Sequence, residues 1–165
     1  MMKQLNNITY IVGDATSPVG EGYKIIAHIV NDMSIWGGGF VLSISRKWKK
    51  PESEYRRKSS YELGTVDYIT VEREENNIII VANMVAQHSI GLNENKDIPL
   101  RYSALVDCLR QLNNAAVSHN ATIHMPRIGS GLAGGNWFVI EQIIREIISQ
   151  PVYIYDMPIG RKFNA

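Results

Sequence analysis

Short apolar runs alternate with amphipathic stretches along the whole 165-residue chain. The runs with the length and composition of β-strands cover residues 8–12, 24–30, 65–71, 78–85, 122–128 and 151–156. The run over 24–30 is almost continuously apolar, which is typical of a strand buried on both faces. The runs over 65–71 and 78–85 flank a short polar segment and predict an antiparallel hairpin.

Helical periodicity follows the second apolar run. Phe40, Ile44 and Trp48 are spaced at i, i+4 and i+8 and form one face of a predicted helix. Pro51 ends that helix, and the polar stretch over 52–63 predicts another. Both predicted helices therefore lie between the second and third predicted strands.

Two more helices are predicted before and after the run over 122–128. Pro99 is a favourable first helical residue, and the apolar face of its helix carries Leu105, Leu109, Leu112 and Ala116. Asn136 can cap the next helix, whose apolar face carries Ile140, Ile143, Ile144 and Ile147. Strands that alternate with amphipathic helices indicate α/β layers. We therefore predict a single domain over 1–165, an α/β fold built as a three-layer α/β/α sandwich around a mixed, mostly parallel six-stranded sheet.

Composition narrows the chemistry. A net charge of +1 provides no strong field for nucleic acid or for an anionic membrane. Cys108 is the single cysteine and the four histidines lack ligand spacing, so we expect no metal site and no cofactor. No apolar run approaches the length of a membrane span, and the N-terminus lacks the pattern of a signal peptide. We therefore expect a cytoplasmic protein with no membrane partner.

A glycine-rich stretch, "RIGSGLAGGNW", begins at Arg127 and contains the spacing G-x-G-x-x-G. This spacing also marks dinucleotide-binding Rossmann folds, and Asp156 lies about 20 residues further on, as that fingerprint requires. Here, however, the glycines belong to the last strand–helix unit and not the first, which argues against a Rossmann enzyme. A P-loop is excluded because no Gly-Lys-Ser/Thr sequence is present in either glycine loop.

A second glycine-rich stretch, "IVNDMSIWGGGF", also lies between an apolar strand and an amphipathic helix. Glycine allows backbone N–H groups to approach a ligand, and the following helix N-terminus adds donors with partial positive charge. Two such loops on neighbouring strands would form the walls of a cleft for a diphosphate. The alternative interpretation is that the glycines only permit tight turns between strand and helix.

The joint pattern of both loops resembles the macrodomain family, the ADP-ribose-binding module, over almost the whole chain. The segments that carry the resemblance are "NITYIVGDAT", "IIAHIVNDMSIWGGGFVLSISRKW", "HMPRIGSGLAGGNW" and "VYIYD". Within the family, the pattern is most similar to the subgroup of ADP-ribose-1″-phosphate phosphatases and terminal ADP-ribose glycohydrolases. The resemblance implies a macrodomain-like fold and a small-molecule partner, ADP-ribose or a derivative.

The ligand-binding positions that the resemblance implies are Gly13, Asp14, Asn31, Trp36, Gly37, Gly38, Gly39, Arg127, Gly129, Ser130, Gly131, Leu132, Ala133, Gly134 and Met157. Asp14 would accept from the adenine amino group, with Met157 as the floor of the adenine site. Residues 37–39 would line the distal ribose, and residues 129–134 would hold the diphosphate. Trp36 would shield the cleft. Asp14 could instead be a solvated turn residue, Met157 a core methionine and Trp36 an apolar wall residue.

The sequence departs from its glycohydrolase relatives at the residues that would carry the chemistry. The glycohydrolase relatives use a lysine and an aspartate of the second loop, whereas Ala133 stands here and no lysine occurs over 78–95. We therefore favour phosphatase chemistry on ADP-ribose 1″-phosphate over the glycohydrolase mechanism. Our candidate catalytic residues are Asn31, Gln87 and His88; His88 could equally be an exposed loop histidine. His28 lies inside an apolar strand and is interpreted as a core histidine.

Two other functions stay open at this point. The protein could be a non-catalytic module that reads or sequesters ADP-ribose or a related nucleotide. A basic cluster over 46–58 could contact nucleic acid, but Glu52 and Glu54 interrupt it, so we interpret it as a solvated helical face. The sequence gives no indication of the oligomeric state.

Overall fold

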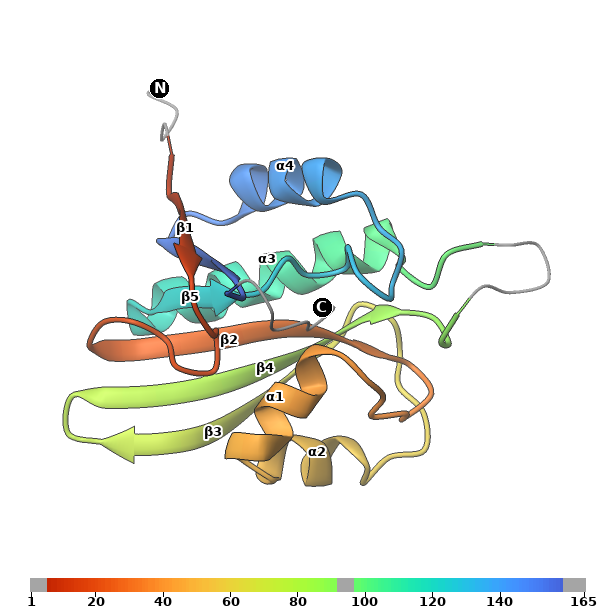
Figure 1. Ribbon diagram of the computed structural model, residues 1–165, viewed down its shortest axis with the longest axis horizontal. Helices are drawn as coiled ribbons and strands as arrows, with labels where there is room; N and C mark the ends of the chain where they lie inside the picture. The colour runs from red at the N-terminus through yellow and green to blue at the C-terminus, as the bar shows by residue number, and fades with distance from the viewer. Residues whose placement is uncertain (1–5, 92–96, 159–165) are drawn as a thin grey trace.

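The computed structural model describes residues 6–91 and 97–158 of the chain (Figure 1). The strands are β1 (Ile8–Val12), β2 (Gly22–Asn31), β3 (Val66–Glu74), β4 (Asn77–Gln87), β5 (Thr122–Met125) and β6 (Val152–Asp156). The helices are α1 (Phe40–Lys47), α2 (Lys50–Tyr55), α3 (Tyr102–His119) and α4 (Trp137–Ile147). Every predicted strand is present, although several bounds differ.

The strands form one sheet in the order β1-β6-β5-β2-β4-β3. Neighbouring strands are parallel except for β3 and β4, which form the predicted antiparallel hairpin. The mixed, mostly parallel six-stranded sheet is therefore confirmed. Because parallel strands end on the same side, the loops that follow β1, β2, β4, β5 and β6 all emerge at one edge of the sheet.

Helices cover both faces of the sheet, which confirms the three-layer sandwich (Figure 1). On β2, Ile25 and Ala27 pack toward α3 and α4, whereas Ile26 and Val30 pack toward α1. All four side chains are nearly inaccessible, as the apolar run predicts. Burial of a large aliphatic side chain contributes about 1.5–3 kcal/mol, so this strand anchors both cores.

A β-bulge ends the pairing of β2 with β4. The two strands stay in register up to Val30 opposite Val85, after which Asn31 lies opposite Gln87. Ala86 is the extra residue in β4. Bulges bend a strand and re-aim its side chains, and this one lies at the edge of the sheet from which the glycine loops emerge.

Proline positions account for the main differences from the predicted bounds. Pro51 lies in the first turn of α2 and does not precede it, because a missing N–H is tolerated there. Leu100, next to Pro99, forms a bridge with Gln87, so α3 begins only at Tyr102. Pro126 cannot donate to a strand ladder, and β5 ends before it.

The second helix is much shorter than predicted. It ends at Tyr55, whereas we expected helix up to residue 63. Tyr55 is 1% exposed, stacks on Tyr61 and donates to the backbone carbonyl of Asn31. The polar residues that follow have no apolar stripe to bury, so nothing favours a longer helix.

The last helix begins as predicted. The side chain of Asn136 accepts hydrogen bonds from the backbone N–H groups of Phe138 and Val139, which confirms it as the N-cap of α4. In the part of the chain that the structure describes, no helix is long and apolar enough to cross a membrane.

Candidate functional site

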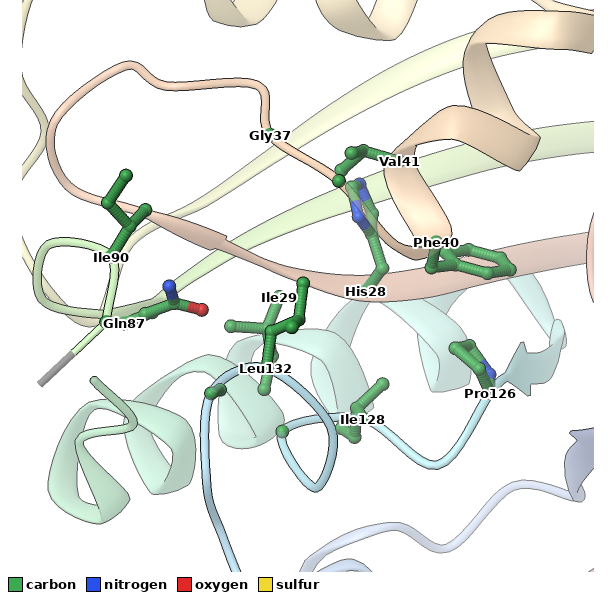
Figure 2. A pocket seen from close by; sticks show the side chains of 14 residues that line it. His28, Ile29, Gly37, Phe40, Val41, Gln87, Ile90, Pro126, Ile128 and Leu132 are labelled. Carbon is green, nitrogen blue, oxygen red and sulfur yellow. The ribbon is translucent and has the colours of Figure 1, made fainter. Parts of the chain in front are cut away.

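A cavity of about 320 Å³ lies between the two glycine loops, at the carboxyl end of β2 (Figure 2). Its lining is His28, Ile29, Gly37, Gly38, Phe40, Val41, Gln87, Ile90, Gly91, Pro126, Ile128, Gly129, Leu132 and Ala133. Most of these residues are apolar or glycine. Among them, His28 and Gln87 supply the polar side chains.

A second cavity of about 260 Å³ lies toward β6. Its lining is Gly13, Ala15, Phe40, Pro126, Arg127, Ser130, Gly131, Tyr155, Asp156 and Met157. Phe40 and Pro126 belong to both linings. The two cavities therefore adjoin, and we refer to them together as one elongated cleft along the carboxyl ends of β6, β5 and β2.

The first glycine loop presents bare backbone to this cleft. Gly37 and Gly38 line the first cavity, and a Cβ on either would have no neighbouring heavy atom within 4 Å beyond the adjacent residues. Gly39 has φ 85° and precedes α1, and no side chain caps that helix. The N-terminus of α1 thus has backbone donors and positive dipole directed to this part of the molecule.

The second glycine loop is built differently. Gly129 and Gly134 have φ values of 72° and 77°, in the left-handed region that favours glycine. The N–H of Gly135 donates to the carbonyl of Gly129 at 2.7 Å, and the N–H of Gly134 donates to Gly131 at 3.0 Å. The N–H groups of residues 131–133 take no part in these turn bonds, and each of these residues lines one of the two cavities.

The guanidinium of Arg127 is already engaged. Its Nε and Nη2 donate to the two carboxylate oxygens of Asp156 at 2.7 and 2.9 Å. The ring of Tyr10 lies 5.0 Å from the guanidinium carbon, and that of Trp137 lies 5.6 Å away. Hydrogen bonding from Arg127 lowers the pKa of Asp156 despite its partial burial. An anion in the cleft would therefore be held mainly by backbone amides.

The residues predicted for the adenine end differ in whether they line the cleft. Gly13 and Met157 line the second cavity. The carboxylate of Asp14 accepts from the N–H and the hydroxyl of Thr16, both at 2.8 Å, and Asp14 lines neither cavity. Its contact with adenine stays a prediction.

Asn31 and Trp36 shape the first loop from behind. The Asn31 side-chain oxygen accepts from the N–H groups of Met33 and Ile35 and from the Tyr55 hydroxyl. Trp36 is 7% exposed and donates from Nε1 to the hydroxyl of Ser45 at 2.8 Å. Neither residue lines a cavity, so the structure does not bring Asn31 together with Gln87 inside the cleft.

Gln87 and His88 follow each other in sequence but have different surroundings. Gln87 lines the first cavity, and Figure 2 shows its amide oxygen directed toward Ile29. Its nitrogen donates to the carbonyl of Ser89 at 2.9 Å. The ring of His88 is about half exposed and lies outside the cavity linings, with Nδ1 at 2.7 Å from a carboxylate oxygen of Asp32.

The pair of Asp32 and His88 fastens the ends of β2 and β4 to each other. Partial burial by itself would raise the pKa of Asp32, but hydrogen bonds from His88 and from the N–H of Ser89 outweigh it and lower that pKa. The carboxylate is therefore ionised at neutral pH. It orients the imidazole at the rim of the site.

The sequence did not predict that His28 contributes to the site. Its ring is hydrogen-bonded and 2% exposed, as expected of a core histidine, yet it forms part of the cavity wall. Nε2 lies 2.5 Å from the amide oxygen of Asn83, and Nδ1 has no partner among the described residues. Burial lowers the pKa of His28 to about 4, so the ring is neutral at pH 7. A polar residue inside an otherwise apolar strand was the available signal.

The second cavity also contains residues that were not predicted. Tyr155 and Asp156 line it from the end of β6. Their sequence signal was weak, since Tyr155 reads as one more strand residue. Over the described ranges 6–91 and 97–158, no cluster of three or more His, Cys, Asp or Glu side chains could hold a metal ion.

Comparison with known proteins identifies the family. A solved structure of a macrodomain protein from Streptomyces coelicolor is 39% identical and superposes with a TM-score of 0.76, covering 90% of this chain and 98% of that one. No protein-family model matches the chain. The identity and the mutual coverage show that this chain belongs to the macrodomain family.

Curated relatives differ in how much of their length the chain spans. The mouse protein Chromodomain-helicase-DNA-binding protein 1-like is 32% identical over 163 residues, but the match covers 92% of this chain and only 18% of that protein. ADP-ribose 1″-phosphate phosphatase of Lodderomyces elongisporus is 26% identical over 159 residues, covering 90% of this chain and 97% of that enzyme.

Proposed function

We propose that the elongated cleft binds ADP-ribose or a derivative of it. The observation that supports this most is the pair of adjoining cavities that share Phe40 and Pro126 and lie between two glycine loops. Each cavity has room for one end of a nucleoside diphosphate sugar, given the usual sizes of ligand pockets. Macrodomain membership and the name of the phosphatase relative support the same ligand.

The proposed orientation follows from the two linings. The adenosine occupies the cavity of Gly13, Tyr155 and Met157, and the distal ribose occupies the cavity of Gly37 and Gly38. The diphosphate then crosses between Phe40 and Pro126. There, the amides of residues 131–133 and the N-terminus of α1 supply donors for its charge.

A calorimetric titration with ADP-ribose, with NAD alongside, tests this proposal. We expect saturable binding of ADP-ribose in the micromolar range and weaker binding of NAD. Leu132→Asp should weaken ADP-ribose strongly, because it adds a carboxylate beside the diphosphate at a residue that is 60% exposed. Val117→Asp makes the same change at an exposed residue of α3 outside the cleft and should bind normally. Absence of heat at millimolar ADP-ribose would disprove the proposal.

A second candidate function is hydrolysis of ADP-ribose 1″-phosphate, favoured by the position of Gln87. In this reaction water attacks phosphorus, the bond from phosphorus to the 1″ oxygen breaks, and ADP-ribose leaves with a 1″-hydroxyl. The Gln87 amide oxygen, directed into the first cavity, can accept from the attacking water and orient it. An amide cannot take up the proton, so we expect a slow enzyme.

Release of inorganic phosphate from ADP-ribose 1″-phosphate measures this activity. We expect Gln87→Ala to reduce the rate about a hundredfold, because the attacking water loses its orientation, while ADP-ribose still binds. Gln111→Ala serves as a control, since Gln111 lies on α3 outside both cavity linings. Saturable binding with no phosphate released by the wild type would instead identify a non-catalytic binding module.

Protein de-ADP-ribosylation through a lysine and a loop aspartate receives no support from the described lining. Ala133 is 4% exposed and stands in the cavity wall where a carboxylate would be required. Among the described residues that line the first cavity, none is a lysine, an aspartate or a glutamate.

A further inference from the structure

The wall of the first cavity contains a buried polar atom with no hydrogen-bond partner. Among the buried side-chain nitrogens and oxygens of the described residues, only Nδ1 of His28 lacks one. The ring rises from β2 toward Val41 and the loop at Gly37 (Figure 2). An unpaired buried polar atom costs free energy, and a neighbouring cavity is where a partner can arrive.

The identity of that atom is fixed by its surroundings. The Asn83 side-chain nitrogen donates to the carbonyl of Pro51 at 3.4 Å, which turns the Asn83 oxygen toward His28. Nε2 of His28 must then be the protonated nitrogen, because an amide oxygen only accepts. Nδ1 is left with a lone pair. It is an acceptor.

Apolar groups isolate this acceptor from the rest of the protein. The ring of Trp36 lies edge-on at 5.6 Å and that of Phe40 at 5.9 Å, and neither offers a donor to Nδ1. Gly37 and Gly38 line the same cavity and have open space where a Cβ would be. The cavity is therefore the side from which a ligand group can approach the ring.

We propose that His28 is a specificity-determining residue that accepts a hydrogen bond from a hydroxyl group of the distal ribose, and that Asn83 is the positioning residue that sets its tautomer. This inference rests on the proposed binding of ADP-ribose. The lone pair on Nδ1 of His28 would also repel a phosphate oxygen, because both atoms are hydrogen-bond acceptors. A 1″-phosphate must therefore point away from His28, and a ribose hydroxyl toward it.

The strand register makes Asn83 a fixed partner. His28 lies opposite Asn83 where β2 pairs with β4, and both residues are almost completely buried. Asn83→Asp keeps an oxygen acceptor for Nε2–H and should preserve the tautomer. Asn83→Leu removes that acceptor and should release the ring.

The test compares ADP-ribose with ADP, which lacks the distal ribose, by calorimetric titration. We expect His28→Phe to weaken ADP-ribose about tenfold and to leave ADP unchanged within about twofold. Asn83→Leu should reduce the preference for ADP-ribose over ADP in the same way, and Asn83→Asp should retain it. Equal losses of affinity for ADP-ribose and ADP, or no loss for either, would overturn the assignment. If His28→Phe does not fold, the two Asn83 variants decide it.

Nuclear magnetic resonance of ¹⁵N-labelled histidine reads the tautomer directly. We expect His28 in the wild type to be neutral at pH 7 with its proton on Nε2, and to lose that single form in Asn83→Leu. A proton on Nδ1 in the wild type would overturn the inference. If the wild type binds neither nucleotide, the proposed function is wrong and the ribose assignment falls with it, whereas normal binding with an unaltered preference in His28→Phe overturns the inference alone.

Discussion

Both loops of the cleft are rich in glycine, but they need their glycines for different reasons. In the first loop, Gly37 and Gly38 have open space where a side chain would begin. In the second loop, a Cβ on Gly135 would lie 2.3 Å from Leu100 and 2.6 Å from the carbonyl oxygen of Gly129. Glycine in the first loop leaves room for a ligand, whereas glycine in the second lets the loop pack against the protein.

The helices behind the loops show the same contrast. Helix α4, which follows the second loop, begins with the side-chain cap of Asn136, whereas α1 has no side-chain cap. Two N–H groups at the start of α4 are satisfied by the Asn136 side chain, whereas no side chain takes up the N–H groups at the start of α1. Substitution of the packed Gly135 in the second loop should therefore mainly change stability, and substitution of Gly37 or Gly38 in the first should mainly change binding.

Gly135→Ala should give the largest change in stability. Its methyl group would overlap a backbone oxygen that a rotamer change cannot move, so we expect a loss of about 3 kcal/mol in the free energy of unfolding. Urea denaturation measures it, with Gly37→Ala as the matched control from the other loop. Equal stability of the two variants would refute the contrast between the loops.

Acid should act through the wall of the first cavity. The pKa of His28 is about 4 in the folded chain and about 6.5 when unfolded, so the unfolded chain binds the proton first. The contribution of the neutral His28 ring to the free energy of unfolding is complete above pH 6.5 and is lost as the pH falls toward 4. Between pH 7 and pH 5 the wild type should lose about 2 kcal/mol more stability than His28→Gln. Parallel curves for the two proteins would show that His28 is not buried as a neutral ring.

Asn136→Ala should destabilise the protein by about 1 kcal/mol, since two backbone N–H groups at the start of α4 lose their acceptor. Asn136→Ser should recover most of this loss because serine also caps helices well. Thermal unfolding of the three proteins provides the comparison. Failure of serine to restore stability would argue that Asn136 acts through something other than its cap.

Gly37→Ala should change stability least, by less than about 0.5 kcal/mol, because its methyl group meets no other atom. The same methyl group narrows the first cavity, so binding of ADP-ribose should weaken about tenfold or more. Denaturation and calorimetry on the same preparation separate the two effects. Unchanged affinity would mean that the ligand does not approach this backbone.

Much of the fold could be predicted from the sequence because its signals are local. The continuous apolar run of β2 and the hairpin of β3 and β4 follow from composition and spacing. The bond from the Tyr55 hydroxyl to the carbonyl of the distant Asn31 could not be predicted, since it joins two segments that no local pattern relates. The order of the strands across the sheet likewise depends on packing between segments far apart in sequence.

The candidate site shows the same limit. Glycine runs and strand ends indicated where the loops would meet, and Gln87, predicted as a candidate catalytic residue, lines the first cavity. The free nitrogen of His28 depends on the orientation of Asn83, which lies 55 residues away and has no recognisable motif. By contrast, the bond between Asp14 and the N–H of Thr16 is local, since an aspartate in a turn often accepts from the backbone two residues on.

The bulge at Ala86 has a consequence for how the rim of the cleft can vary. Two paired strands count residues together, much as a reading frame does, and Ala86 shifts that frame by one just before the site. Deleting Ala86 would restore the frame and leave Gln87 opposite Asn31 in a ladder without a bulge. Losing this one codon would thus remove the bend at the rim of the cleft while every residue pair before it was kept.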